Sequence, residues 1–404
     1  MSIEAALARH TEEQGLDRAV ADLVAAAAGV PGFARRLTEA GLSAGDVTGV
    51  AGLAALPVLG KDDMVALQRQ DPPYAGMLAE GARVQRMFQS PGPLYEPQLW
   101  DADWRWGQAL SAMGVGADDV VLNCFGYHLS PAGAMMEQGA HAVGAATVAG
   151  GIGNQDLQVQ AVADLAVTAY TGLPSYLKAL VDRFDAAGLD PDRWRLSRAL
   201  VTAEPLPDSL RAELEQRVPT VRMAYGTGET GLLAYETGDG AGLALADGVL
   251  VQVCDLDTGE PVTDEREGQV VVTLLRPEYP LVRFGTGDLS GWMLGPDGSP
   301  RLRGVLGRVG QAVKVKGMFL HPAQIAAVMS GVDGVADYRF VIGRSEHVDS
   351  LRCELVPADS VAADDLVAEV GRKVREGLRF RADVVVVDML SDGEGVLVDR
   401  RDWA

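Results

Sequence analysis

Hydrophobic and polar positions follow a helical spacing in the first part of the chain. In residues 16–28 apolar side chains recur every three or four positions, and prolines interrupt the pattern at Pro31, Pro57, Pro72 and Pro73. Apolar residues at this spacing predict helices that bury one face, and proline ends a helix or kinks it. We therefore expect residues 1–80 to form helices with short breaks.

From residue 98 to residue 220 short apolar runs alternate with helical segments. The pattern predicts strands at residues 120–122, 145–148, 166–170, 199–202 and 221–225. It predicts helices between them at residues 131–143, 154–163, 175–187 and 208–217. Strands that alternate with helices of this length imply βαβ units and a mostly parallel sheet.

After residue 230 the helical segments disappear for a stretch. Short strands at residues 249–254, 268–275 and 281–284, with turns such as Asp257-Thr258-Gly259, predict an antiparallel or barrel-like portion. The last hundred residues predict strands at 313–315, 338–341, 351–356 and 384–387, with helices at 321–329 and 362–378. This mixture is typical of a small α+β unit.

The length supports two domains, because one hydrophobic core stops growing near ~250–300 residues and this chain has 404. We expect an α/β fold whose large N-terminal domain, residues 1–307, combines mostly parallel sheets with the barrel-like portion. The small α+β C-terminal domain then spans residues 308–404. The boundary is predicted near residues 307–310, where two glycines supply flexible backbone.

Composition and charge exclude several classes of protein. No run of ~18 apolar residues predicts a membrane span, and the first residues lack the basic and apolar regions of a secretory signal, so a cytoplasmic location is expected. The net charge of −21 argues against nucleic-acid and anionic membrane surfaces. Three scattered cysteines and five scattered histidines predict neither a disulfide framework nor a zinc site.

Three segments could carry chemistry. Residues 225–231 (YGTGETG) present the Glu229 carboxylate, a hard ligand for a cation. Residues 283–289 (RFGTGDL) present Asp288, which could accept hydrogen bonds from a ribose diol. Residues 307–322 (GRVGQAVKVKGMFLHP) contain the basic residues Arg308, Lys314 and Lys316, which suit an anion. Taken singly, each segment is explained as well or better by a turn or a solvated strand face.

Taken together, in this order and spacing, the segments resemble the adenylate-forming superfamily of acyl-CoA ligases, and within it the phenylacetate-CoA ligase branch. Residues 56–64 (LPVLGKDDM) look like that branch's LPxxTKxDL motif, residues 171–176 (TGLPSY) are similar to its GTPSY, and residues 203–205 match its GAEP. Residues 139–154 are similar to its acyl-pocket region, and the resemblance covers nearly the whole chain.

The resemblance implies a mobile C-terminal domain and two half-reactions. ATP and a carboxylate give an acyl-adenylate, and the CoA thiolate then displaces AMP. Mg²⁺ is the implied cofactor, held by Glu229, and ATP or AMP and CoA are the implied substrates. Glu229 and Arg308 are the implied catalytic residues. The implied nucleotide-binding residues are Ala203, Glu204 and Pro205 at the adenine, Tyr225 and Gly226 beside it, Asp288 at the ribose, and Arg308. The implied acyl pocket is bordered by Tyr127, His128, Gly150 and Gly151.

The chain departs from the family pattern at the positions that handle phosphate. The family's phosphate loop reads SSGTTGxP, whereas residues 90–97 read SPGPLYEP, so two prolines remove backbone donors and Glu96 adds negative charge. Gly228 stands where the family has threonine, and Gly310 stands where it has the hinge aspartate. Near the C-terminus, Gly393-Glu394-Gly395 lacks the family's lysine.

Three hypotheses therefore stay open. The first is a divergent acyl- or aryl-CoA ligase that acts on a small aromatic carboxylic acid. The second is an ATP-independent enzyme that acts on a preformed acyl-adenylate or acyl thioester, and the third is a non-catalytic ligand-binding relative. The retained Glu229 and Asp288 favour the first two, and the degraded phosphate loop favours the second over the first. The expected partners are a small carboxylate or acyl thioester and CoA, with no nucleic acid or membrane. A homodimer stays open.

Overall fold

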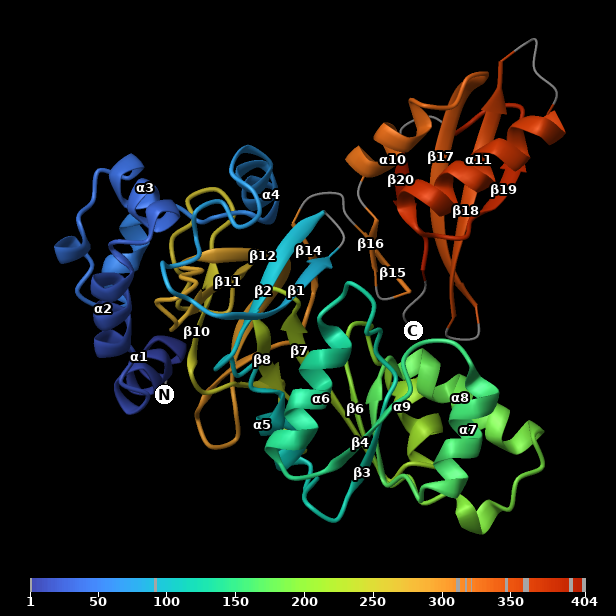
Figure 1. Ribbon diagram of the computed structural model, residues 1–404, viewed down its shortest axis with the longest axis horizontal. Coiled ribbons are helices and arrows are strands. Elements are labelled where there is room, and N and C mark those ends of the chain that lie inside the picture. The colour runs from blue at the N-terminus through green and yellow to red at the C-terminus, as the bar shows by residue number, and fades with distance from the viewer. Residues whose placement is uncertain are drawn as a thin grey trace. The chain divides into compact units, whose positions relative to one another are not determined.

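The computed structural model describes residues 2–90, 93–309, 313–316, 318–320, 322–345, 348–358, 363–391 and 395–401. The chain divides into two compact units (Figure 1). The first comprises Met1–Leu206 and Arg211–Val309, and the second comprises Gly310–Ala404 with Pro207–Leu210. Over the described ranges, every helix is too short or too polar to cross a membrane.

Helices dominate the N-terminal region, as the sequence predicts. They are α1 (Ile3–Glu13), α2 (Leu16–Ala27), α3 (Pro31–Glu39) and α4 (Lys61–Gln70), with 3₁₀ turns at Ala44–Asp46 and Ala51–Ala55. The apolar face of α2, formed by Leu16, Val20, Leu23, Val24 and Ala27, is buried. It belongs to one hydrophobic cluster with Leu56 and Phe284, so the N-terminal helices share a core with the strand that begins at Phe284.

A large mixed sheet forms the centre of the first unit. Its parallel strands are β3 (Val120–Asn123), β4 (Ala146–Ala149), β5 (Ala169–Gly172), β6 (Arg198–Val201) and β7 (Thr220–Thr227), arranged β7-β6-β5-β3-β4. The helices of this region are α5 (Trp106–Ala112), α6 (Ala132–Ala142), α7 (Gln155–Asp164), α8 (Pro174–Ala186) and α9 (Asp208–Glu215), with a 3₁₀ turn at Pro191–Arg193. Helices α7 and α8 pack side by side (Figure 1). The predicted α/β class is confirmed.

Beyond β7 the sheet continues with antiparallel strands. In sheet order they are β8 (Gly231–Tyr235), β9 (Leu243–Leu245), β13 (Pro300–Leu302), β12 (Phe284–Leu294), β11 (Glu267–Leu274) and β10 (Val249–Cys254), and β14 (Gly307–Arg308) pairs with β12. A separate hairpin joins β1 (Val84–Ser90) to β2 (Leu94–Leu99). Since β14 pairs Arg308 with Asp288, Arg308 belongs to the first unit and not to the predicted C-terminal domain.

Two strand predictions are wrong near a residue with a positive φ: one strand is absent and the other begins later than predicted. The strand predicted at residues 281–284 is absent, because Arg283 has a φ of +50° and β12 begins only at Phe284. The strand predicted from residue 166 begins at Ala169, and Ala166 has a φ of +49°. A left-handed backbone cannot continue a strand ladder, and apolar residue type alone does not reveal it.

The second unit is a small α+β structure. Its elements are β15 (Val313–Val315), β16 (Met318–Leu320), α10 (Pro322–Met329), β17 (Val335–Ser345), β18 (Val348–Pro357), α11 (Ala363–Leu378), β19 (Asp383–Val386) and β20 (Leu397–Asp399). The four-stranded sheet has the order β19-β18-β17-β20, and its core contains Phe340, Ile342 and Val370. Of the sequence positions discussed above, Gly310, His321, Gly393 and Glu394 lie outside the described residues.

Candidate active site

A buried polar cluster forms where β7, β12 and β14 meet. The Tyr225 hydroxyl donates to Asp288 Oδ2 at 2.9 Å and lies 3.1 Å from Thr286 Oγ1. Arg308 Nε lies 3.5 Å from Asp288 Oδ1, and Arg308 Nη2 donates to the Thr286 carbonyl oxygen at 3.2 Å. Three residues that the resemblance assigns to nucleotide binding are therefore in contact. Gly287 has a φ of +79°, a conformation that favours glycine, and a Cβ at this position would also lie 2.9 Å from Arg308 Nη2.

Glu229 lies in the turn between β7 and β8 and forms a buried ion pair with Lys61, the first residue of α4. Their side chains are only 5% and 17% exposed. Burial opposes ionisation of Glu229, but attraction to Lys61 and hydrogen bonding with it outweigh burial and lower the pKa of this carboxyl. In the same way, burial opposes the charge on Lys61, but Glu229 outweighs burial and raises the pKa of the ammonium.

Lys61 lies in the motif of residues 56–64, but nothing in the sequence indicated a role for this lysine. The backbone explains how it reaches Glu229. Leu59 N donates to the Arg283 carbonyl oxygen at 2.8 Å, and Gly285 N donates to the Leu59 carbonyl oxygen at 2.9 Å. These bonds tie the residues before α4 to the start of β12, the strand that carries Asp288.

Two buried arginines reinforce this junction through backbone carbonyls. Arg36 donates to the Val282 oxygen at 2.7 Å and to the Pro57 oxygen at 2.9 Å. Arg283 donates to the Leu53 oxygen at 3.2 Å. These bonds join α3 and the segment before Leu59 to the residues before β12, and so help to fix the start of α4, where Lys61 lies.

The expected phosphate segment ends β1 and begins β2, with Pro91 and Gly92 outside the described residues. Glu96 is buried, and its Oε1 accepts a hydrogen bond from Ser90 Oγ at 2.7 Å. Its Oε2 accepts none from the residues that the structure describes. Burial, together with the negative charge of Glu229, raises the pKa of Glu96 to about 8.

The two unusual residues Glu96 and Gly228 are in contact. A Cβ at Gly228 would lie 3.1 Å from both carboxylate oxygens of Glu96, closer than nearly all real Cβ contacts. A threonine at position 228 would therefore require the Glu96 carboxylate to shift by a few tenths of an ångström. The two departures from the family pattern are neighbours in the structure.

The segment matched to the adenine lies at the end of β6. Glu204 is buried and accepts a hydrogen bond from Ser175 Oγ at 2.6 Å, while Pro205 is exposed. Ala203 has a φ of +73°, in the left-handed region where an alanine is strained. Such strain is concentrated at functional sites, although the adenine role of Ala203, Glu204 and Pro205 stays a prediction.

The residues matched to the acyl pocket lie around Asn123, at the end of β3. Asn123 Nδ2 donates to Tyr127 Oη and to the Gly133 oxygen, both at 2.8 Å. Gln158 Nε2 donates to the oxygens of Gly150 and Gly151 at 3.0 Å, and Gly151 N donates to the Asn123 oxygen at 3.0 Å. This network brings Tyr127, Gly150 and Gly151 together, whereas His128 is exposed. Neither Asn123 nor Gln158 was singled out by the sequence.

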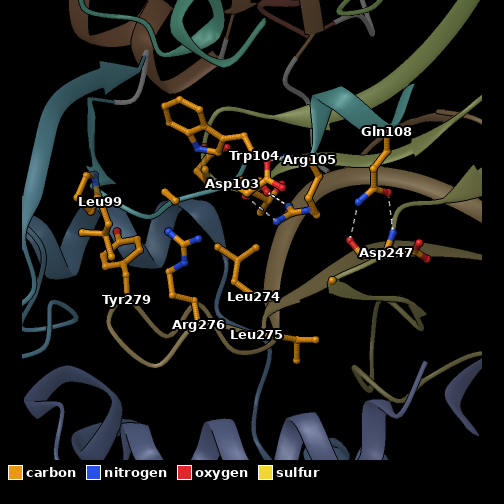
Figure 2. A pocket seen from close by; sticks show the side chains of 15 residues that line it. Leu99, Asp103, Trp104, Arg105, Gln108, Asp247, Leu274, Leu275, Arg276 and Tyr279 are labelled. Carbon is orange, nitrogen blue, oxygen red and sulfur yellow. Dashed lines mark hydrogen bonds between the residues drawn. The ribbon is translucent and has the colours of Figure 1, made fainter. Parts of the chain in front are cut away.

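A cavity of about 310 Å³ lies in the first unit beside Glu229 (Figure 2). Its lining includes Arg105, Gln108, Arg276 and Tyr279. Among the predicted site residues only Glu229 lines it, so the cavity is not centred on the Tyr225–Asp288–Arg308 cluster. Figure 2 shows Gln108 hydrogen-bonded to the backbone of Asp247, a contact that holds one wall.

Comparison with known proteins finds one matching family and several similar ligases. The family described as AMP-binding enzyme matches residues 99–273. The phenylacetate-coenzyme A ligase of Pseudomonas putida is 26% identical over 391 residues, covering 91% of this chain and 88% of that protein. The enzyme of the same name from Thermus thermophilus is 25% identical, covering 93% and 86%.

Among solved structures, 2-hydroxyisobutyryl-CoA ligase in complex with 2-HIB-AMP and CoA in the thioesterification state has a TM-score of 0.89. The alignment covers 98% of this chain and 91% of that one at 22% identity, so it supports the fold. The chain is thus similar to enzymes of the adenylate-forming superfamily, and within it to the phenylacetate-CoA ligases.

The resemblance implies Mg²⁺ at Glu229. The residues around Glu229 show whether this site could coordinate the ion. The Glu229 carboxylate is already paired with the Lys61 ammonium, and Gly228 offers no hydroxyl. Among the described residues no group of three histidine, cysteine, aspartate or glutamate side chains could hold a metal. While Lys61 stays paired, the arrangement does not fit a divalent cation at Glu229.

The strain at Ala203 predicts an unusual response to glycine. Replacing a left-handed alanine by glycine removes a penalty of ~1–2 kcal/mol and loses part of that gain to chain entropy. We expect Ala203→Gly to raise the free energy of unfolding by ~0.5–1 kcal/mol in urea denaturation. Ala199→Gly, in β6, is the control and should lower it. A destabilised Ala203→Gly variant would contradict the strain.

The raised pKa of Glu96 predicts pH-dependent stability. Between its ordinary pKa of 4.5 and about 8, the folded state holds a proton that the unfolded state has released. Its contribution to stability is therefore complete below pH 4.5 and is lost as pH rises towards 8. The unfolding free energy of Glu96→Gln minus that of wild type should therefore be larger at pH 8 than at pH 5, by about 1 kcal/mol or more.

The measurement for Glu96 is urea denaturation at both pH values. The control is Glu12→Gln, at an exposed position on α1. If the difference between wild type and Glu96→Gln is the same at pH 5 and pH 8, Glu96 is not buried as described.

Proposed function

We propose that this protein forms CoA thioesters of a small carboxylic acid through an acyl-adenylate, and that the acid is aromatic. The observation that carries the proposal is the contact among Tyr225, Asp288 and Arg308 in a chain of this superfamily. The two relatives named phenylacetate-coenzyme A ligase support the aromatic acid.

In this proposal the acyl-adenylate spans two of the described groups of residues. The Asp288 carboxylate accepts hydrogen bonds from the ribose hydroxyls, and the Tyr225 hydroxyl holds that carboxylate in place. The segment of residues 203–205 lies along the adenine. The acyl group lies against Tyr127, Gly150 and Gly151, whose positions are fixed by Asn123 and Gln158.

The thioester step follows from these positions. The CoA thiolate attacks the acyl carbonyl carbon, a carbon–sulfur bond forms, and the bond to the phosphate oxygen breaks. AMP leaves with that electron pair. The Arg308 guanidinium, already held by Asp288 and the Thr286 carbonyl oxygen, stabilises the negative charge on the departing phosphate. A cation positioned in advance needs little reorganisation during the reaction.

The test supplies the acyl-adenylate directly. Wild-type protein is mixed with phenylacetyl-adenylate and CoA, and phenylacetyl-CoA is measured by chromatography. We expect Asp288→Asn to reduce kcat/KM at least about tenfold, because a charged acceptor for two hydroxyls becomes a neutral amide, a loss of ~1.5–3 kcal/mol. The control is Asp297→Asn, in an exposed turn of the same unit. No thioester with phenylacetyl-, benzoyl- or isobutyryl-adenylate would contradict the proposal.

The second candidate, an enzyme that does not use ATP, is favoured by the position of Glu96. Its buried carboxyl packs on Gly228 beside Glu229, in the segment that the family uses for phosphates. The β- and γ-phosphates would meet this carboxyl, whose pKa is raised to about 8, and neighbouring prolines that have no backbone N–H, instead of the family's threonine hydroxyls and free amides. In this candidate the acyl-adenylate or thioester is supplied preformed.

Affinity for nucleotides separates the two candidates. We expect AMP to bind at least about tenfold more tightly than ATP, because each lost hydrogen bond to a charged phosphate costs ~1.5–3 kcal/mol. Isothermal titration calorimetry with both nucleotides, with Mg²⁺ present, is the measurement. Equal affinity, together with pyrophosphate release when a carboxylic acid is added, would leave the ATP-dependent ligase as the function.

A further inference from the structure

The ammonium of Lys61 lies where the family resemblance places a metal ion. It contacts the Glu229 carboxylate directly, and both side chains are shielded from solvent. We propose that Lys61 is the permanent counter-ion of Glu229 and that this chain binds the nucleotide part of its substrate without a divalent cation. The inference rests on the proposed function, since it names the cation of that same site.

The helix does not explain the presence of a lysine at this point. Lys61 is the first residue of α4, where the free amide groups of a helix carry partial positive charge. A cation is unfavourable at this end, and Asp62 and Asp63 supply the acidic residues that the first turn favours. Gly60 N is capped by Asp63 Oδ2 at 3.1 Å, so the helix start is complete without Lys61. The Glu229 carboxylate attracts the ammonium to this position.

The charges around the pair are balanced without a metal. Lys61 pairs with Glu229, and Arg308 pairs with Asp288 at 3.5 Å. Lys61 also interacts electrostatically with Arg308 and with Glu96, so the two ion pairs are neighbours in one site. The α-phosphate of a nucleotide bound at Asp288 would meet two cations held in advance. A divalent cation at Glu229 would have to displace a buried ammonium and leave it next to Arg308.

The position of Lys61 is set by backbone hydrogen bonds of the segment before α4, in addition to the ion pair of its side chain. The bonds of Leu59 to Arg283 and Gly285 fix α4 relative to β12, and Arg36 adds bonds to Val282 and Pro57. Moving Lys61 away from Glu229 by a shift of α4 would break these bonds. A cation that enters from the cavity beside Glu229 would therefore have to displace the lysine side chain while α4 stays in place.

The first experiment measures metal binding to the protein without nucleotide. Mn²⁺ is titrated into wild type, Lys61→Met and the double variant Lys61→Met with Glu229→Gln, and free Mn²⁺ is followed by electron paramagnetic resonance. We expect Lys61→Met to bind Mn²⁺ at least about tenfold more tightly than wild type, and the added Glu229→Gln to abolish this gain. Lys178→Met, which removes a surface lysine paired with Asp182, should behave as wild type.

The second experiment measures AMP binding by calorimetry in EDTA and in Mg²⁺. Wild type should give dissociation constants that agree within about twofold. Lys61→Met should bind AMP at least about tenfold more weakly in EDTA and recover in Mg²⁺, while Lys61→Arg, which keeps the charge, should stay close to wild type. If Mg²⁺ tightens AMP binding to wild type tenfold, or wild type binds Mn²⁺ at a site that Glu229→Gln removes, the proposal is overturned.

The two experiments separate the proposal from the function on which it rests. If AMP binds under no condition, the nucleotide function fails, and the Mn²⁺ titration still decides the role of Lys61. If Lys61→Met does not fold, the wild-type comparisons in EDTA and Mg²⁺ and the Mn²⁺ titration of Glu229→Gln decide it.

Discussion

Buried charges in this protein must be matched by other charges or by hydrogen bonds, and the candidate site is organised by that requirement. A charge removed from water without a partner costs several kcal/mol. Lys61 and Glu229 satisfy one another, as do Arg308 and Asp288. The first pair joins the start of α4 to the turn after β7, 168 residues further along the chain, and the second joins the neighbouring strands β12 and β14.

The same requirement explains why the departures from the family pattern occur together. A carboxyl at position 96 needs space and a neighbour that does not repel it further. Glycine at position 228 provides the space, and Lys61 offsets part of the charge of Glu229. The loss of hydroxyl groups from the phosphate loop could be interpreted as random loss of function. Instead, Glu96 packs against Gly228 and accepts a hydrogen bond from Ser90, so the replaced residues form specific contacts with one another.

The alternation of strands and helices between residues 98 and 220 was predictable because each element has a single spacing of apolar residues along its length, and that spacing distinguishes a helix from a strand. Helix α6, predicted at residues 131–143, spans Ala132–Ala142, and β10 has the predicted bounds. The hairpin of β1 and β2 was missed, since β2 contains Pro97 and Glu96, which are rare in strands. The break at Arg283 was missed because residue type does not reveal a positive φ.

The candidate site was predictable where a motif sits on one segment and unpredictable where contacts join distant segments. Asp288 and Tyr225 were singled out by their glycine-rich surroundings, and the structure brings them into contact. Lys61, Asn123 and Gln158 carry no such local signal. The partner of Lys61 is Glu229, 168 residues away, and the partners of Asn123 and Gln158 lie in neighbouring turns whose course the residue types do not reveal.

The way in which the N-terminal helices attach has a consequence for how this sequence can change. Arg36 and Arg283 bind carbonyl oxygens of Val282, Pro57 and Leu53, and every residue type has that oxygen. Substitutions at these three acceptor positions therefore preserve the hydrogen bonds as long as the backbone keeps its course. Evolutionary drift can alter the apolar side chains at this junction while the two arginines continue to hold α4, and with it Lys61, in register with the strand that bears Asp288.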